Sequence, residues 1–248
     1  MVIPDDIGKY ALGLYGPRSV VNYTASPWSA GSLAQLPDNQ IISYHYDSYG
    51  FRKAEGVIGK RVAFGCSHTF GYEVAVENSY PFLLNATNFG VTAASPQTVA
   101  RLVQNWIPNS DVEEVIILMP EKSRREIWNP NTATYTMMLP WNLDQYSRTV
   151  YDKHGEWVKL RQTGNDTEDP KRVMKFLEEH PHLDVLDDKK NSAILDECIE
   201  SVKRNVGERK LILKTMDDVP PPDFKARDRT HNGDAWQRKV AQLFQREL

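Results

Sequence analysis

Residues 61–73 read RVAFGCSHTFGYE, an apolar run that stops at Gly65 and is followed at once by Cys66, Ser67 and His68. A short apolar run that ends at a glycine is typical of a buried strand. Two further runs of this kind follow at 88–91 (NFGV) and 112–120 (VEEVIILMP), with the helical pattern SPQTVARLVQNWI (95–107) between them. Because strands here alternate with helices, the sequence predicts a parallel sheet in an α/β fold.

The rest of the chain extends this pattern and adds two irregular regions. We expect a last strand at 210–215 and helices at 78–87, 95–107, 168–180, 191–206 and 234–248. Residues 1–60 are predicted to form an extended lead-in packed on the core, because turn-forming residues and scattered aromatics dominate them. Residues 61–248 then form one domain with an aromatic-rich insertion, including a small hairpin, at about 121–165. The predicted architecture is a three-layer α/β/α sandwich with a central parallel sheet.

Composition limits the classes of function. The chain has 248 residues and a formal net charge of −3, and its basic residues are scattered among acids, so no nucleic-acid partner is expected. No apolar run approaches the ~20 residues of a membrane span, and no secretory signal is recognised, so we expect synthesis in the cytoplasm and no membrane partner. Two cysteines indicate a reducing compartment. The oligomeric state stays open, as does membership of a larger particle.

Ser67 is the candidate for chemistry in the opening stretch. It follows a strand and precedes a helix, at the carboxyl edge of the predicted sheet, where such sheets bind ligands. Unpaired backbone N–H groups at this place can stabilise an oxyanion. Side chains alternate along a strand, so if Ser67 faces the crevice, Cys66 and His68 are expected not to, and Cys66 is interpreted as a small buried apolar residue. The simpler alternative is that Ser67 only caps a helix. No metal is expected, because Cys66 and His68 lack further ligands nearby, and no cofactor is expected.

A serine hydroxyl needs a base, and the candidate is His231. It lies three residues after Asp228, in a loop between the last predicted strand and the last helix. Such a loop also leaves the carboxyl edge of the sheet, so Asp228 can orient one ring nitrogen while the other faces Ser67. The alternative is that both residues belong to a solvated surface loop.

These residues together resemble the SGNH (GDSL-type) hydrolase family. The stretch Gly65–Gly71 is similar to the family's G-D-S-x-T-x-G block, and Asp228–His231 is similar to its D-x-x-H block. Asn88–Gly90 followed by Ser95 resembles the second block, and DSYGFR (47–52) resembles the lead-in of some members. The resemblance covers about residues 47–119 and 208–248. It implies a flavodoxin-like α/β/α fold and a serine esterase with Ser67, Asp228 and His231 as the catalytic triad.

The chain departs from this family at two positions. Cys66 replaces the aspartate before the serine, and the stretch PEKSRRE (120–126) has no asparagine where the family places an oxyanion donor. The resemblance then implies an oxyanion hole formed by the N–H groups of Ser67 and Gly90, and we expect Arg124 or Ser123 to supply the missing donor.

The expected function is hydrolysis of an ester through an acyl-enzyme on Ser67, with a small acyl group such as acetyl on a carbohydrate. The alternative is a scaffold of the same type with weak or no activity, which acts as a structural or carbohydrate-binding component of a larger assembly. The aromatic side chains of the insertion are compatible with both hypotheses, because such side chains pack in hydrophobic cores and also stack on sugar rings.

Overall fold

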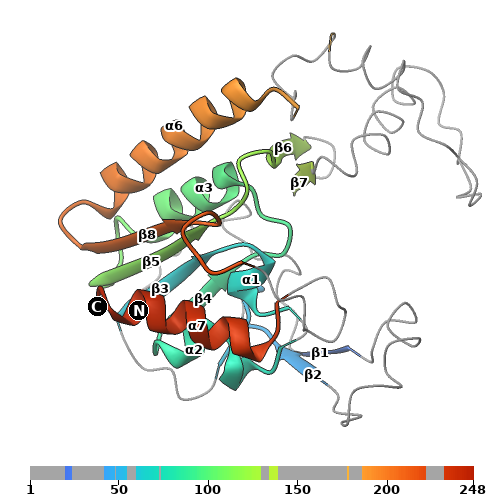
Figure 1. Ribbon diagram of the computed structural model, residues 1–248, viewed down its shortest axis with the longest axis vertical. Helices are drawn as coiled ribbons and strands as arrows, with labels where there is room; N and C mark the ends of the chain where they lie inside the picture. Colours follow the sequence, from blue (N-terminus) through green and yellow to red (C-terminus); the bar gives the residue numbers. More distant parts are fainter. Residues whose placement is uncertain are drawn as a thin grey trace, which may run out of the picture.

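A parallel sheet of four strands forms the centre of the computed structural model, which describes residues 20–23, 42–47, 49–54, 60–72, 74–129, 134–138, 178, 186–221 and 232–248. The strand order is β4-β3-β5-β8 (Figure 1). Their bounds are Arg61–Gly65 for β3, Thr87–Gly90 for β4, Glu114–Met119 for β5 and Lys210–Thr215 for β8. All four predicted core strands are therefore confirmed, with ends shifted by at most two residues in β4 and β5.

Helices cover both faces of this sheet. On one face lie α3 (Pro96–Trp106) and α6 (Asp188–Val206), which pack in the cluster that contains Phe64, Val99 and Val202. On the other face lie α2 (Tyr80–Leu83) and α7 (Asp234–Gln245), with Ile116 and Trp236 in their cluster. Figure 1 shows the two helical layers with the sheet between them. The predicted three-layer α/β/α fold is thus confirmed.

Local capping sets where the helices begin. Ser95 caps α3 as predicted, since its side chain accepts the Thr98 N–H and the Thr98 side chain accepts the Ser95 N–H. The helix α6 begins at Asp188, earlier than the predicted residue 191, because the Asp187 side chain accepts the N–H groups of Lys189 and Lys190. The predicted helix at 78–87 is shorter than expected and consists of the 3₁₀ turn Val76–Asn78 and then α2.

Two pairs of antiparallel strands lie outside the main sheet. In the lead-in, β1 (Val20–Tyr23) pairs with β2 (Ile42–His45). The rings of Tyr44 and Tyr46 stack on Phe70 at centroid distances of 5.4 and 6.2 Å. After β5, the strands β6 (Arg125–Asn129) and β7 (Thr134–Met138) form the hairpin expected in the insertion. The helix predicted at 168–180 lies outside the described residues except for Glu178.

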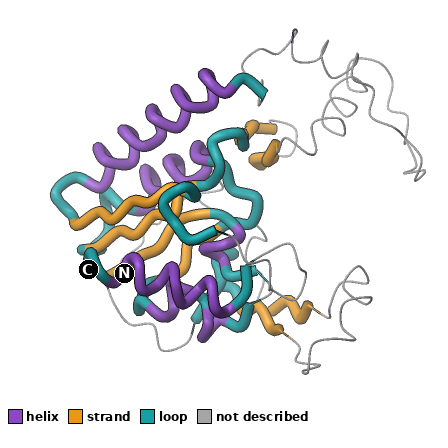
Figure 2. The backbone as a smooth tube through the Cα atoms, viewed as in Figure 1, coloured by secondary structure: helices purple, strands orange, loops and turns teal. Residues whose placement is uncertain are grey.

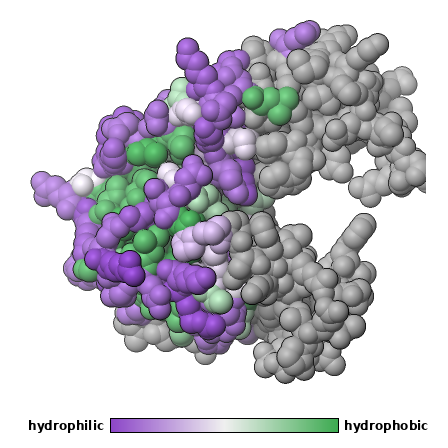
Figure 3. Space-filling view, in the orientation of Figure 1, coloured by the Kyte–Doolittle hydropathy of each residue, from purple (hydrophilic) through white to green (hydrophobic). Residues whose placement is uncertain are grey.

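The described surface is mostly polar. Figure 3 shows hydrophilic residues along the outer helices and hydrophobic residues in the spaces between them. Among the described residues, the exposed large hydrophobic side chains are Leu83 and Leu186. None of the helices in these ranges is both long enough and apolar enough to cross a membrane.

Candidate active site

Ser67 is the first residue of α1 (Ser67–Phe70), which begins immediately after β3 at the carboxyl edge of the sheet. Figure 2 shows this short helix next to the loops at that edge. Glycines allow α1 to lie close to the strands. A Cβ on Gly65 would come within 2.7 Å of the Leu118 carbonyl oxygen, and one on Gly90 within 2.7 Å of the Thr69 carbonyl carbon. Gly90 is therefore required for packing as well as for any role in the site.

Asn88 fastens α1 to the neighbouring strand. Its side-chain amide donates to the carbonyl oxygens of Thr69 (2.9 Å) and Phe70 (3.4 Å), while its Oδ1 accepts the Gly90 N–H at 2.8 Å. The Gly90 N–H is thus already engaged by a side chain of its own strand. This geometry disfavours the expected role of Gly90 as a second oxyanion donor, because such a donor must be free to meet the developing charge.

Arg52 contacts the carboxyl end of α1. The sequence analysis placed Arg52 in the DSYGFR motif but did not predict this contact. Its guanidinium donates to the carbonyl oxygens of Phe70 (2.9 Å), Gly71 (2.5 Å) and Val74 (2.7 Å). It also lies 4.7 Å from the centre of the Tyr44 ring. A cation is favourable at the carboxyl end of a helix, where carbonyl groups lack partners. The lead-in segment thereby fixes the position of the turn that carries Ser67.

Cys66 belongs to the hydrophobic cluster that also contains Phe64, Val99 and Val202. It is the N-cap residue of α1, outside the strand, so the alternation rule does not apply to Cys66 and Ser67. Its side chain is fully buried in the core, as expected of a small apolar residue. Burial raises the pKa of the Cys66 thiol, so the sulfur is held as the neutral thiol.

His68 points toward the start of α7. Its Nδ1 lies 3.4 Å from Nδ2 of Asn232, and its ring centre lies 5.2 Å from that of Trp236. Its carbonyl oxygen accepts from Nε2 of Gln237 at 3.0 Å. Asp228 and His231 lie outside the described residues, so the triad with Ser67 stays a prediction.

A tight turn follows β4 and is bonded to the end of β3, two residues before Ser67. The Val91 N–H donates to the Gly65 carbonyl oxygen at 3.0 Å, and the Ala94 N–H closes the turn on Val91 at 3.1 Å. Ala93 occupies this turn with a φ of 62°, a left-handed conformation that is unusual for a residue with a Cβ. Within the described part of the chain, the Ala93 N–H has no hydrogen-bond acceptor. Strained residues of this kind occur often at functional sites.

Arg124 also lies at this edge of the sheet and is 5% exposed. It forms an ion pair with Glu121 at 2.5 Å, and its Nη1 lies 3.5 Å from the Ala94 carbonyl oxygen. Its charge acts on the Cys66 thiol, where it partly offsets the effect of burial on the pKa of Cys66. Arg124 therefore lies near both Cys66 and the 91–94 turn, whereas Ser123 is partly exposed. The donor role expected of either residue stays a prediction.

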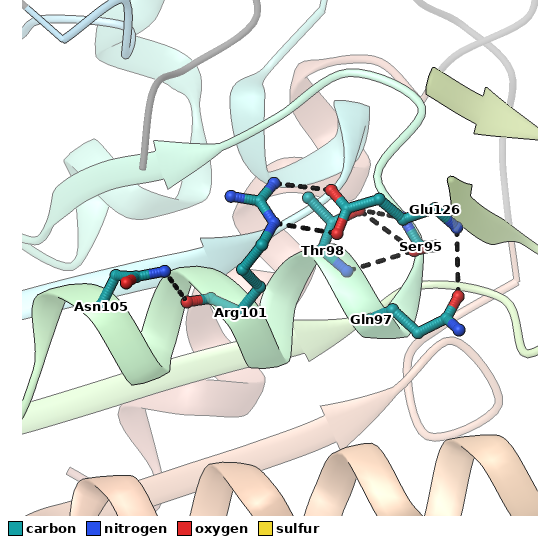
Figure 4. Close-up of polar contacts among 6 residues, drawn as sticks. All are labelled: Ser95, Gln97, Thr98, Arg101, Asn105 and Glu126. Carbon is teal, nitrogen blue, oxygen red and sulfur yellow. Dashed lines mark hydrogen bonds and ion pairs between the residues drawn. The ribbon is translucent and has the colours of Figure 1, made fainter. Parts of the chain in front are cut away.

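The segment that carries Arg124 is held against α3. Figure 4 shows Glu126 accepting from Nε and Nη2 of Arg101, at 2.9 and 2.6 Å. The Glu126 N–H donates to the Gln97 side chain at 3.1 Å (Figure 4). Next to it, Arg125 is 1% exposed and donates to the carbonyl oxygens of Lys122 and Arg124 and to Asn191. The position of Arg124 thus rests on well-defined contacts with two helices.

Within the described ranges, no three His, Cys, Asp or Glu side chains come together in a way that could hold a metal ion. The chemical groups at this edge are instead a hydroxyl, backbone N–H groups and a guanidinium.

No protein-family model matches the chain, and no curated protein matches it. Among solved structures, it is similar to a "putative GDSL-like lipase" from Bacteroides ovatus, with a TM-score of 0.36 and 17% sequence identity. The match covers 78% of this chain and 53% of that one, so this chain spans about half the length of the solved protein.

Proposed function

We propose that the protein is a serine esterase in which Ser67 forms an acyl-enzyme. In this proposal His231 removes the proton from the Ser67 hydroxyl and then returns it to the leaving alcohol, while Asp228 orients the imidazole. A water molecule, activated by the same histidine, then releases the acid and restores Ser67.

One observation carries this proposal. The described residue that follows His231 in the chain is Asn232, and its side chain contacts the residue that follows Ser67, namely His68. Consecutive Cα atoms are about 3.8 Å apart, so Ser67 and His231 each lie one residue from this contact. The contact therefore supports a site in which Ser67 and His231 belong to neighbouring backbone segments. Without it, the two residues would be related only by their motifs.

The oxyanion donors that we propose are the N–H groups of Ser67 and Ala93. Ser67 is the first residue of α1, so its N–H lacks a partner within the helix. The N–H of Ala93 takes the place expected for Gly90, because the Gly90 N–H is engaged with Asn88. Arg124 is proposed as the third donor, since its guanidinium reaches the same turn at Ala94. Ser123 is the alternative third donor.

The proposed substrate carries a small acyl group, such as acetyl on a carbohydrate. Ser67 is only 6% exposed, which favours a small acyl group at the nucleophile. The aromatic residues of the insertion suit contact with a sugar ring.

A second candidate function is a binding scaffold without catalysis. Two departures favour it: residues 120–126 contain no asparagine, and the Gly90 N–H is engaged by Asn88, so two expected oxyanion donors are missing. In this alternative the same edge of the sheet binds a carbohydrate within a larger assembly.

Labelling with a fluorophosphonate separates the two candidates. The esterase requires covalent label on Ser67 and turnover of p-nitrophenyl acetate that falls at least about 1000-fold in Ser67→Ala. Ser201→Ala, which removes a hydroxyl on α6, serves as the matched control and should keep the activity and the label. Full activity in Ser67→Ala would exclude Ser67 as the nucleophile, and the absence of both label and turnover in the wild type would favour the scaffold.

A further inference from the structure

We propose that His68 is a positioning residue, which holds Asn232, two residues before the start of α7, against the turn that carries Ser67. The inference rests on the proposed function. It states that the contact between His68 and Asn232 sets the placement of the nucleophile Ser67 relative to the base His231, because each of the two residues directly follows one of them in the chain. It concerns a side chain that the triad itself does not use.

The side chains of the pair are in contact. Nδ2 of Asn232 lies 3.4 Å from Nδ1 of His68, a distance at which the amide can donate to the ring nitrogen. Such a hydrogen bond requires the tautomer of the His68 ring that carries its proton on Nε2. Asn232 is 1% exposed and His68 is 8% exposed, so this contact is largely shielded from competing water.

The surroundings make the pair a rigid junction between α1 and α7. The Gln237 side chain on α7 contacts both α1 and α2, because its Nε2 donates to the His68 carbonyl oxygen at 3.0 Å and its Oε1 accepts the Tyr80 N–H at 2.9 Å. The Tyr80 hydroxyl lies 2.7 Å from Oγ1 of Thr69. These contacts fix the main chain on both sides of the junction, and the His68 ring is left to set the side-chain contact with Asn232.

His68 is not a second candidate for the base. Consecutive residues on a helix do not face one another, and Ser67 and His68 are consecutive in α1. The Nδ1 of His68 is also directed at Asn232 and its ring at Trp236. A role in placing another residue fits these contacts better than proton transfer with Ser67.

Replacement of the acceptor tests the role. His68→Leu and Asn232→Ala both remove the contact. We expect kcat for p-nitrophenyl acetate to fall about 10- to 100-fold while KM changes less than about twofold, because a catalytic group misplaced by about 1 Å can lower the rate by about 100-fold. His68→Asn can place a side-chain oxygen near the position of Nδ1, so it should recover kcat to within about threefold of the wild type. The matched control is His45→Leu, at an exposed histidine on β2, which should leave kcat unchanged.

A purely structural role predicts a different pattern. It would lower the melting temperature in His68→Leu without lowering kcat of the folded enzyme, and His68→Asn would give no recovery. An unchanged kcat in His68→Leu, in a protein whose Ser67→Ala variant is inactive, overturns the positioning role and leaves the proposed function intact.

Amide hydrogen exchange tests the role of His68 even if the wild-type protein is inactive. Amide hydrogen exchange at residues 232–234 should become at least about tenfold faster in His68→Leu, with exchange in the middle of α7 unchanged. Unchanged exchange at 232–234 overturns the inference whether or not the protein is an esterase. If the wild type is inactive and exchange is faster in His68→Leu, the role of His68 in holding Asn232 is supported and only the esterase proposal is refuted.

Discussion

Replacing Arg52 by methionine should destabilise the protein by about 3 kcal/mol. The substitution keeps the apolar stem beside the Tyr44 ring and removes hydrogen bonds to the carbonyl oxygens of Phe70, Gly71 and Val74. Two of these oxygens keep another donor, since Phe70 also accepts from Asn88 at 3.4 Å and Gly71 from the Val74 N–H at 3.3 Å.

The magnitude follows from those three bonds. A hydrogen bond from a charged donor contributes about 1.5–3 kcal/mol, and the acceptors that keep a second donor lose less than this. We therefore count about 1 kcal/mol for each bond, which corresponds to a melting temperature about 6–12 °C lower in a chain of this size. Burial lowers the pKa of Arg52 to about 10, so the guanidinium is still charged in a measurement at pH 8.

Thermal unfolding followed by circular dichroism measures the effect. Arg204→Met, on the exposed side of α6, is the matched control and should change stability by less than about 0.5 kcal/mol. A decrease of less than about 3 °C in Arg52→Met would refute the reasoning, because it would mean that water replaces the guanidinium at the end of α1 without cost.

Four further outcomes are expected. Arg124→Ala should lower kcat by about 100-fold with little change in KM, as for the loss of an oxyanion donor, and equal kcat in steady-state assays would exclude that role. Burial raises the pKa of both thiols, that of Cys198 to about 11, so a disulfide reagent at pH 8 should modify neither Cys66 nor Cys198 until the chain unfolds. Because the thiol pKa values are higher in the folded state, the contribution of the thiols to the free energy of unfolding should be fully present below the unfolded thiol pKa of about 8.5 and should decrease at higher pH. An unchanged midpoint of urea unfolding between about pH 8 and 10 would contradict this. Glu126→Ala should cost about 2 kcal/mol in urea unfolding, since it leaves the 15%-exposed Arg101 side chain without its carboxylate partner; a cost below about 0.5 kcal/mol would show that this pair does not hold the segment.

Hydrophobic pattern and capping residues were enough to predict the central elements. The apolar runs at 61–65 and 114–119 are buried on both faces, and such runs occur where helices cover a parallel sheet on each side. Ser95 and Pro96 likewise marked the start of α3, because capping depends on residues that are close in the chain. Such patterns predict an element correctly because they depend on residues close in the chain and little on the rest of the fold.

Contacts between distant residues could not be predicted in the same way. Nothing in the sequence indicates that Arg52 donates to the carbonyl groups at the end of α1, or that Gln237 bridges His68 and Tyr80. The Gly90 N–H looked available from its motif, yet Asn88 engages it two residues away, and only the three-dimensional geometry shows this.

The sequence by itself therefore determined the order of strands and helices, the three-layer class of fold and the place of Ser67 at the end of a strand, because periodicity and turn residues act over a few positions. Only the tertiary structure decided which groups lie around the turn that carries Ser67. Asn88 contacts Thr69, Asn232 contacts His68 and Arg124 lies near Cys66. These three side chains come from separate elements, so their placement depends on how the sheet and helices pack.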